Sequence, residues 1–257
     1  MTAVHVDSTY ILLPLVAFAA FIVKGVTGFG PAIVVVAVGS LLLPPQSVIA
    51  LSAMLDATAG LILYRMDPLH GKERFWIPLT LSVVVGAVGG GLLLAVVPTH
   101  VFRPLLGVAI LVLALWFYAL RSRRTPTTLA EELPERCSGT DIASTVAGGV
   151  MGGLLGITGP PILWHFGKRF GKRILRQTLI PIFLADAVAR VVTYTGTGFI
   201  GASVVQYYVA ALPGLFAGLY VGNRLFGRVS EAVFSRIVGL ILLAIGLRLL
   251  VQELGGG

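Results

Sequence analysis

Four ionisable residues stand inside otherwise apolar stretches of the sequence: Lys24, Asp56, Asp186 and Arg190. A charged side chain at the centre of a bilayer costs about 2.5–3.5 kcal/mol on insertion scales, and such residues usually face a bundle interior or a wet cavity. The two aspartates could carry protons or bind a coupling cation, and Lys24 could complement an anion. Arg190 follows Asp186 by one helical turn, a spacing at which the side chains can touch. The alternative is that the two acids and two bases form neutralising structural pairs.

Two glycine-rich breaks lie in the same apolar stretches. Tip one covers residues 25–31 and tip two covers residues 153–161, and in each a proline follows the last glycine. Proline suits the first turn of a helix, so we expect a new helix to begin at each tip. The free N–H groups and the positive dipole end of such a helix form a site for anions. The alternative is that the glycines only permit tight turning and close helix packing.

The predicted substrate site brings both tips together near the midplane of a membrane. Glycine lets a ligand approach the backbone, the threonine in each tip adds a hydroxyl group, and a small oxyanion fits this chemistry. The residues predicted to bind it are Lys24, Thr27, Gly28, Phe29, Gly30, Thr158, Gly159 and Pro160. The residues predicted to couple its movement to protons or to a cation are Asp56, Asp186 and Arg190. No catalytic residue, metal ligand or cofactor is predicted.

Other polar and small residues are better explained by structure than by binding. Tyr64 and Tyr194 stand at the ends of apolar stretches, where interface anchoring is expected. His165 is close to tip two, yet a packing histidine is favoured over a ligand. Glycines at four-residue spacing favour close helix contact. They are Gly86, Gly90, Gly148, Gly152, Gly156, Gly214, Gly218 and Gly222.

The composition is that of an integral membrane protein. Hydrophobic residues make up 56% of the 257 residues and charged residues 12%, against about 25% charged in soluble domains. Apolar stretches mostly reach the roughly 20 residues that a spanning helix needs. They lie at residues 9–43, 46–64, 76–97, 101–120, 141–167, 177–195, 202–221 and 232–252. No cleaved signal peptide is expected, because no basic segment precedes the first apolar stretch.

The net charge of +8 reports topology and not nucleic-acid binding, because the basic residues flank the apolar stretches. If each tip crossed the membrane once, the basic segments 121–140 and 168–176 would face opposite sides, against the positive-inside rule. If each tip is instead a re-entrant hairpin, all basic loops face the cytoplasm. Residues 9–43 as one helix would also measure about 50 Å, against a hydrocarbon core of about 30 Å. A broken helix that fully spans is the competing model.

The sequence therefore predicts an all-α polytopic membrane protein with two inverted repeats, each a re-entrant broken-helix hairpin plus three transmembrane helices. Residues 1–8 are an extracytoplasmic tail, residues 9–120 the first repeat, residues 121–140 a basic cytoplasmic linker, and residues 141–253 the second repeat. Both termini are expected to be extracytoplasmic. The single cysteine, Cys137, allows no disulfide within the chain.

The two halves repeat one another in order and spacing. Residues 55–64 match residues 185–194, aspartate on aspartate and tyrosine on tyrosine, and glycine-spaced third helices and Val-Phe starts of the fourth helices follow in both halves. Together with the two tips, this pattern resembles the sulfite exporter TauE/SafE family, also called the toluene-sulfonate uptake permease family, over about residues 10–252. The resemblance implies secondary transport of small sulfur-containing anions such as sulfite, sulfoacetate or other organosulfonates.

The favoured function is a proton-coupled carrier of such an anion in the inner membrane. The alternative is an uncoupled anion channel, or a carrier for a different small organic anion, on the same scaffold. An enzyme is not expected, since no metal-ligand spacing or nucleophile set is found, and no phosphate-binding loop for ATP is present. The expected partners are a small anionic substrate and the lipid bilayer, with a homodimer left open and no nucleic acid.

Overall fold

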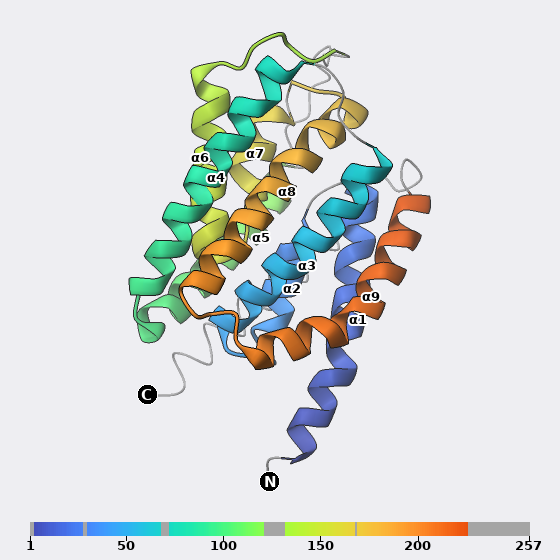
Figure 1. Cartoon of the computed structure of the whole chain (residues 1–257), viewed down its shortest axis with the longest axis vertical. Helices are drawn as coiled ribbons and strands as arrows, with labels where there is room; N and C mark the ends of the chain where they lie inside the picture. Colours follow the sequence, from blue (N-terminus) through green and yellow to red (C-terminus); the bar gives the residue numbers. More distant parts are fainter. Residues whose placement is uncertain (1–2, 28–29, 68–71, 121–131, 168, 226–257) are drawn as a thin grey trace.

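The computed structural model describes residues 3–27, 30–67, 72–120, 132–167 and 169–225, and nearly all of these are helical (Figure 1). The helices are α1 Ala3–Thr27, α2 Pro31–Gly39, α3 Pro45–Met66, α4 Glu73–Val96, α5 Thr99–Leu120, α6 Gly139–Leu155, α7 Gly159–Phe166, α8 Lys172–Gly196 and α9 Ala202–Arg224. The predicted last stretch of the second repeat, residues 232–252, lies outside the described residues.

Five of these helices are long and apolar enough to cross a membrane: α1, α3, α4, α8 and α9. Large apolar side chains stand exposed on their outer faces, including Ile11 on α1, Val85 on α4 and Val209 on α9. Soluble proteins rarely expose apolar surface over so many elements. The prediction of an all-α membrane protein is confirmed.

Each glycine-rich tip separates a longer helix from a short one. Gly30 and Gly156 both adopt a left-handed backbone, with φ of 88° and 76°. Gly30 is the N-cap of α2, and Gly156 is the C-cap at which α6 ends. In the second half the chain then turns back on itself, because Ile162 of α7 packs over the position of Gly148 on α6. The second tip is therefore the turn of a helical hairpin. In the first half, α2 likewise lies against α1. The inverted orientation of the two halves across a bilayer stays a prediction.

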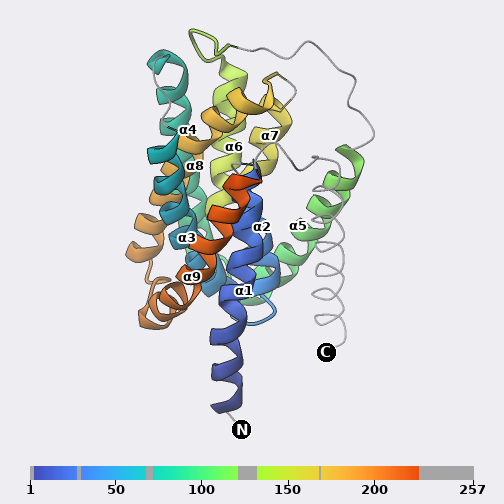
Figure 2. The ribbon, with the colours of Figure 1, turned by 90° about the vertical axis from the view of Figure 1, so that its right-hand side faces the viewer.

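Two helix pairs come together backbone against backbone, as Figures 1 and 2 show. In the first pair α6 packs against α4, and a Cβ atom on Gly90 would overlap the carbonyl oxygen of Val150. In the second pair α1 packs against α9, and a Cβ atom on Gly214 would overlap the carbonyl oxygen of Pro14. The packing role predicted for these glycines is confirmed, since only a hydrogen atom fits at the contact.

The centre of the bundle is formed by α3 and α8, which run antiparallel between these two pairs (Figure 1). Gly60 of α3 allows the close approach, because a Cβ atom there would lie 3.2 Å from the side chain of Leu184 on α8. Asp56 of α3 and Asp186 of α8 thereby face the same interior space. The fold places the two matching aspartates of the halves at one site.

Candidate functional site

One interior cavity gathers the four ionisable residues that the sequence placed inside apolar stretches. We call these the charge quartet: Lys24 on α1, Asp56 on α3, and Asp186 and Arg190 on α8. The first residues of α2, the residues around the start of α7, and Phe183 of α8 complete the described lining. Every member of the quartet is buried, with at most 6% of its surface exposed. Water outside the cavity therefore gives these charges little screening.

The quartet is joined by hydrogen-bonded ion pairs. The Lys24 ammonium group donates to Asp56 Oδ1 at 2.8 Å and to the Asp56 backbone carbonyl at 3.3 Å. Arg190 bridges the two acids: its Nε donates to Asp186 Oδ2 at 2.9 Å and its Nη2 to Asp56 Oδ2 at 3.3 Å. The predicted contact between Asp186 and Arg190 one turn apart is confirmed, and the neutralising pairs considered above do form.

Two polar atoms of the quartet are left over. Arg190 Nη1 and Asp186 Oδ1 are buried and have no hydrogen-bond partner among the described residues. A buried polar group without a partner costs about 1–3 kcal/mol, and more when it is charged. Both residues belong to the cavity lining, so the lining includes one residue with an unsatisfied donor and one with an unsatisfied acceptor. Such a site favours a polar ligand.

The two helix starts contribute unequally to this cavity. Neither α2 nor α7 has a side-chain cap. The N-cap residue of α2 is Gly30, which has no side chain, and the Thr158 hydroxyl at the start of α7 instead donates to Asp186 Oδ2 at 2.6 Å. Proline has no N–H group, and α7 carries two prolines within its first three residues, whereas α2 carries one. The free donors of α2 are therefore those of Ala32 and Ile33, both of which line the cavity. The start of α2 therefore offers more free N–H donors than the start of α7, and anion binding at the two tips stays a prediction.

Sequence comparison agrees with this architecture. A family model described as "Sulfite exporter TauE/SafE" matches residues 13–249. The chain belongs to this family. A relative named "Probable sulfite/organosulfonate exporter TauE", from Cupriavidus necator, is 27% identical over 255 residues, which cover 95% of this chain and 96% of that protein. No solved structure matches the chain significantly. The chain is thus a multi-pass membrane protein of a transporter family, which points to transport and not to catalysis.

Most of the residues predicted for substrate binding or coupling line the cavity of this TauE/SafE family member. They are Lys24, Gly30, Thr158, Gly159, Asp56, Asp186 and Arg190. Pro160 is buried in the first turn of α7 but is not part of the lining. Thr27 ends α1, and its side chain lies outside the described part, as do Gly28 and Phe29 entirely. Their substrate contacts stay predictions.

Sequence reasoning missed several lining residues. Phe183 lies on α8 three positions before Asp186, so it shares the helix face of Asp186 and Arg190 and could have been found from that spacing. Pro31, Ala32 and Ile33 form the first turn of α2, and the anion-binding argument for tip one already pointed at them. Ile157 gave no such signal, because an apolar residue in a glycine-rich turn has no distinct pattern.

The prediction that Tyr194 anchors the chain at a membrane interface is wrong. Its side chain is fully buried, and its hydroxyl donates to the carbonyl of Gly153 at 2.7 Å. Position near the end of an apolar stretch suggested an interface, but α4 and α6 cover that end of α8. Tyr194 instead holds the last turn of α6, at the residue where tip two begins. Tyr64, its counterpart, is half-buried and lines an apolar groove on the outer side of α4 and α8.

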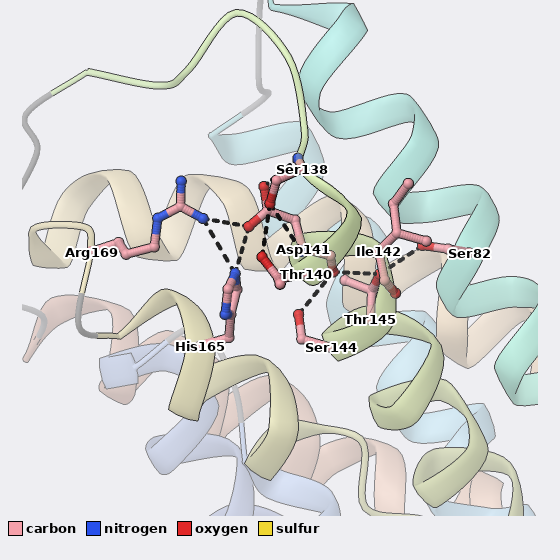
Figure 3. A network of polar contacts seen from close by, with 9 residues as sticks. All are labelled: Ser82, Ser138, Thr140, Asp141, Ile142, Ser144, Thr145, His165 and Arg169. Carbon is pink, nitrogen blue, oxygen red and sulfur yellow. Dashed lines mark hydrogen bonds and ion pairs between the residues drawn. The ribbon is translucent and has the colours of Figure 1, made fainter.

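A separate polar network closes the open end of the second hairpin, well away from tip two (Figure 3). Asp141 in the first turn of α6 contacts His165 Nε2 near the end of α7 at 2.5 Å, and the same oxygen accepts from Arg169. The other oxygen accepts from the backbone N–H of Ser138 at 2.7 Å, as part of a capping box. His165 is thus satisfied by structural contacts, and it does not line the cavity.

The cavity is small. Its volume is about 20 Å³, counted as the space open to the centre of a water molecule. One water needs about 10–15 Å³ on this measure, so the space accommodates about one water and no larger ion. An oxyanion can enter only if the charge quartet rearranges or the helices move. Among the described residues, the space at the charge quartet is thus too narrow to hold an oxyanion as it stands.

Proposed function

We propose that this protein is a secondary transporter that moves a small sulfur-containing anion, such as sulfite, sulfoacetate or another organosulfonate, across the inner membrane, with protons as the coupling ion. The observation that carries the proposal is the buried charge quartet around one small cavity, with an arginine in its lining that has an unsatisfied donor. The basic linker is placed on the cytoplasmic side and both termini on the opposite side.

The anion specificity rests on donors. Lys24 and Arg190 supply two positive charges, and Ala32 and Ile33 supply backbone N–H groups at the start of α2. Charged donors of this kind make short, strong bonds to oxyanions. The cavity lining among the described residues also includes apolar groups, Phe183 and Ile157, which suit the carbon end of an organosulfonate. The name of the Cupriavidus necator relative supports the same substrate class.

The coupling rests on the two acids. Asp56 and Asp186 lie in the membrane-spanning helices α3 and α8, in direct contact with the cations that an anion would use. Carboxylates at this depth serve as proton relays in many transporters. Binding of anion and of proton at one cluster links their movement, because each changes the charge that the other meets.

The test is flux of sulfite and sulfoacetate in proteoliposomes with and without an imposed pH gradient. We expect uphill movement driven by the gradient in the wild type, and loss of that drive in Asp56→Asn and Asp186→Asn. The matched control is Asp67→Asn, which removes a half-buried aspartate at the end of α3 that accepts from Gln177. It should behave as the wild type.

Two outcomes contradict the proposal. Downhill flux that does not depend on the pH gradient, and that persists in both aspartate variants, indicates an uncoupled channel. Absence of flux for both sulfur anions, together with flux of another small organic anion, changes the substrate class while leaving a carrier in place.

A further inference from the structure

We propose that the charge quartet binds each monovalent anion together with one proton, and that Asp56, and not Asp186, is the carboxylate that receives it. This inference rests on the proposed anion transport. Beyond that transport, the inference specifies the number of protons per anion and the residue that carries the proton.

The first argument is the charge count. With all four groups ionised, two positive and two negative charges cancel, so the described lining of the cavity carries no net charge. The ionisable groups that line it come from α1 and α3, with Lys24 and Asp56, and from α8, with Asp186 and Arg190; the described parts of α2, α6 and α7 contribute none to the lining. The buried hydroxyl of Tyr194 on α8 is nearby and neutral. An added anion alone would leave the site with one uncompensated negative charge.

A net charge at this depth is costly, because little water reaches these side chains. A proton taken up with the anion restores neutrality. The proton comes from the aqueous side on which the site opens, and it leaves to the other side together with the anion. No covalent bond other than the O–H bond of the carboxyl group forms or breaks.

The second argument is competition for donors. The cavity has room for about one water, so an oxyanion cannot sit beside the quartet and must take hydrogen-bond donors from it. Arg190 Nη1 is the one donor of the guanidinium without a partner among the described residues. The other charged donors within reach, Lys24 Nζ and Arg190 Nη2, are both engaged by Asp56. An anion that enters therefore displaces Asp56 from its partners.

The third argument is that anion binding removes different hydrogen-bond donors from the two acids. The side-chain oxygens of Asp56 accept only from Lys24 and Arg190 among the described residues. Asp186 also accepts from the Thr158 hydroxyl at 2.6 Å, a neutral donor that the anion does not need, and from Arg190 Nε at 2.9 Å. When the anion binds, Asp56 loses both of the donors that it has among the described residues, whereas Asp186 keeps the two donors to its Oδ2 atom. Protonation of Asp56 removes the unpaired charge.

The experiment measures protons taken up when the purified full-length protein binds methanesulfonate, a monoanion whose own charge does not change near neutral pH. Titration calorimetry in two buffers of different ionisation enthalpy gives the proton number. We expect about one proton per anion bound in the wild type, and an affinity that falls about tenfold for each unit of rise in pH over the range where uptake occurs.

Two variants separate the acids. Asp56→Asn should bind with no proton uptake and with an affinity that no longer depends on pH. Asp186→Asn should still take up about one proton, and Asp67→Asn should match the wild type. If uptake disappears in Asp186→Asn and persists in Asp56→Asn, the assignment to Asp56 is overturned.

The wild-type measurement tests the inference even if a variant does not fold. Anion binding without proton uptake in the wild type overturns the coupled stoichiometry and leaves anion transport standing. Failure of the wild type to bind methanesulfonate, sulfite or sulfoacetate over the whole pH range overturns the substrate class and this inference with it.

Discussion

The pairing of Lys24 with Asp56 predicts a specific pattern of stability. Lys24→Met keeps the length of the side chain and removes its charge, so Asp56 loses the donor at 2.8 Å and keeps, among the described residues, the Arg190 donor at 3.3 Å. Removal of one partner from a buried ion pair costs about 3–5 kcal/mol. Because Arg190 remains, we expect the lower end, about 3 kcal/mol, which is roughly a hundredfold change in the unfolding equilibrium.

The double variant Lys24→Met/Asp56→Asn distinguishes a broken pair from a lost packing contact. Replacement of both charges by neutral groups of similar size is often close to neutral in stability. We therefore expect the double variant to recover most of the loss and to unfold within about 1 kcal/mol of the wild type. Acidification should also reduce the deficit of the single variant, because protonation neutralises the orphaned carboxylate.

The assay is equilibrium unfolding in mixed micelles of mild detergent and SDS, followed by circular dichroism. Arg74→Met, at an exposed position in the first turn of α4, is the matched control and should change stability by less than about 0.5 kcal/mol. A single variant as stable as the wild type, or a double variant no more stable than the single, refutes the buried pair as described.

Three more substitutions test the packing and the tip with the same unfolding assay. Gly90→Ala forces a methyl group into the backbone of α6 and should destabilise by about 1–3 kcal/mol, whereas its neighbour Gly89→Ala meets nothing within 4 Å and should be neutral or stabilising. Tyr194→Phe removes a buried hydrogen bond and should cost about 1–3 kcal/mol and slow sulfite flux, unlike Tyr64→Phe in the outer groove. Asp141→Ala removes the N3 side chain of the capping box and the contacts to His165 and Arg169 that close the second hairpin, and should cost about 1–2 kcal/mol without changing methanesulfonate affinity. Equal stability within any of the matched pairs, or an altered affinity in the last variant, contradicts the corresponding contact.

The membrane class and the helices were predictable because they depend on local composition. An apolar stretch of about 20 residues has few alternatives to a spanning helix, and a proline after a glycine break starts a new helix whatever surrounds it. The second hairpin was predicted from the distribution of basic loops and from the excess length of the broken stretches. Its turn at tip two is visible in the return of α7 along α6.

The site was only partly predictable because it depends on which helices are neighbours. The contact of Asp186 with Arg190 follows from spacing on one helix and was expected. The contacts of Asp56 with Lys24 and with Arg190 cross from α3 to α1 and α8, and no local pattern specifies those pairings. Tyr194 was mispredicted for the same reason. Its position near the end of α8 was clear from the sequence, but the sequence did not show that α4 and α6 cover that end.

The two halves share a scaffold but carry their basic residues, Lys24 and Arg190, at different positions. This difference brings both bases to the two aspartates in the charge quartet. Lys24 stands beside tip one, and its counterpart in the second half is Gly152, where a Cβ atom would lie 2.7 Å from Asp186 Oδ1 and overlap the Thr158 hydroxyl. Arg190 follows Asp186 by four residues, and its counterpart in the first half is Gly60, where α8 packs closely.

Each half therefore supplies one acid at the matching position and one base at a position where the other half has glycine. The space that the lysine uses in one half is filled in the other by the bond from Thr158 to Asp186. A strictly symmetric duplication would give both acids the same partners and no reason for a proton to prefer either. Because the bases differ, Asp56 accepts hydrogen bonds from Lys24 and Arg190, donors that an anion also needs. Asp186 keeps the Thr158 hydroxyl, a donor that the anion does not need. The departure from symmetry thus allows Asp56 to be protonated when the substrate binds, while Asp186 keeps its structural hydrogen bonds to Thr158 and Arg190.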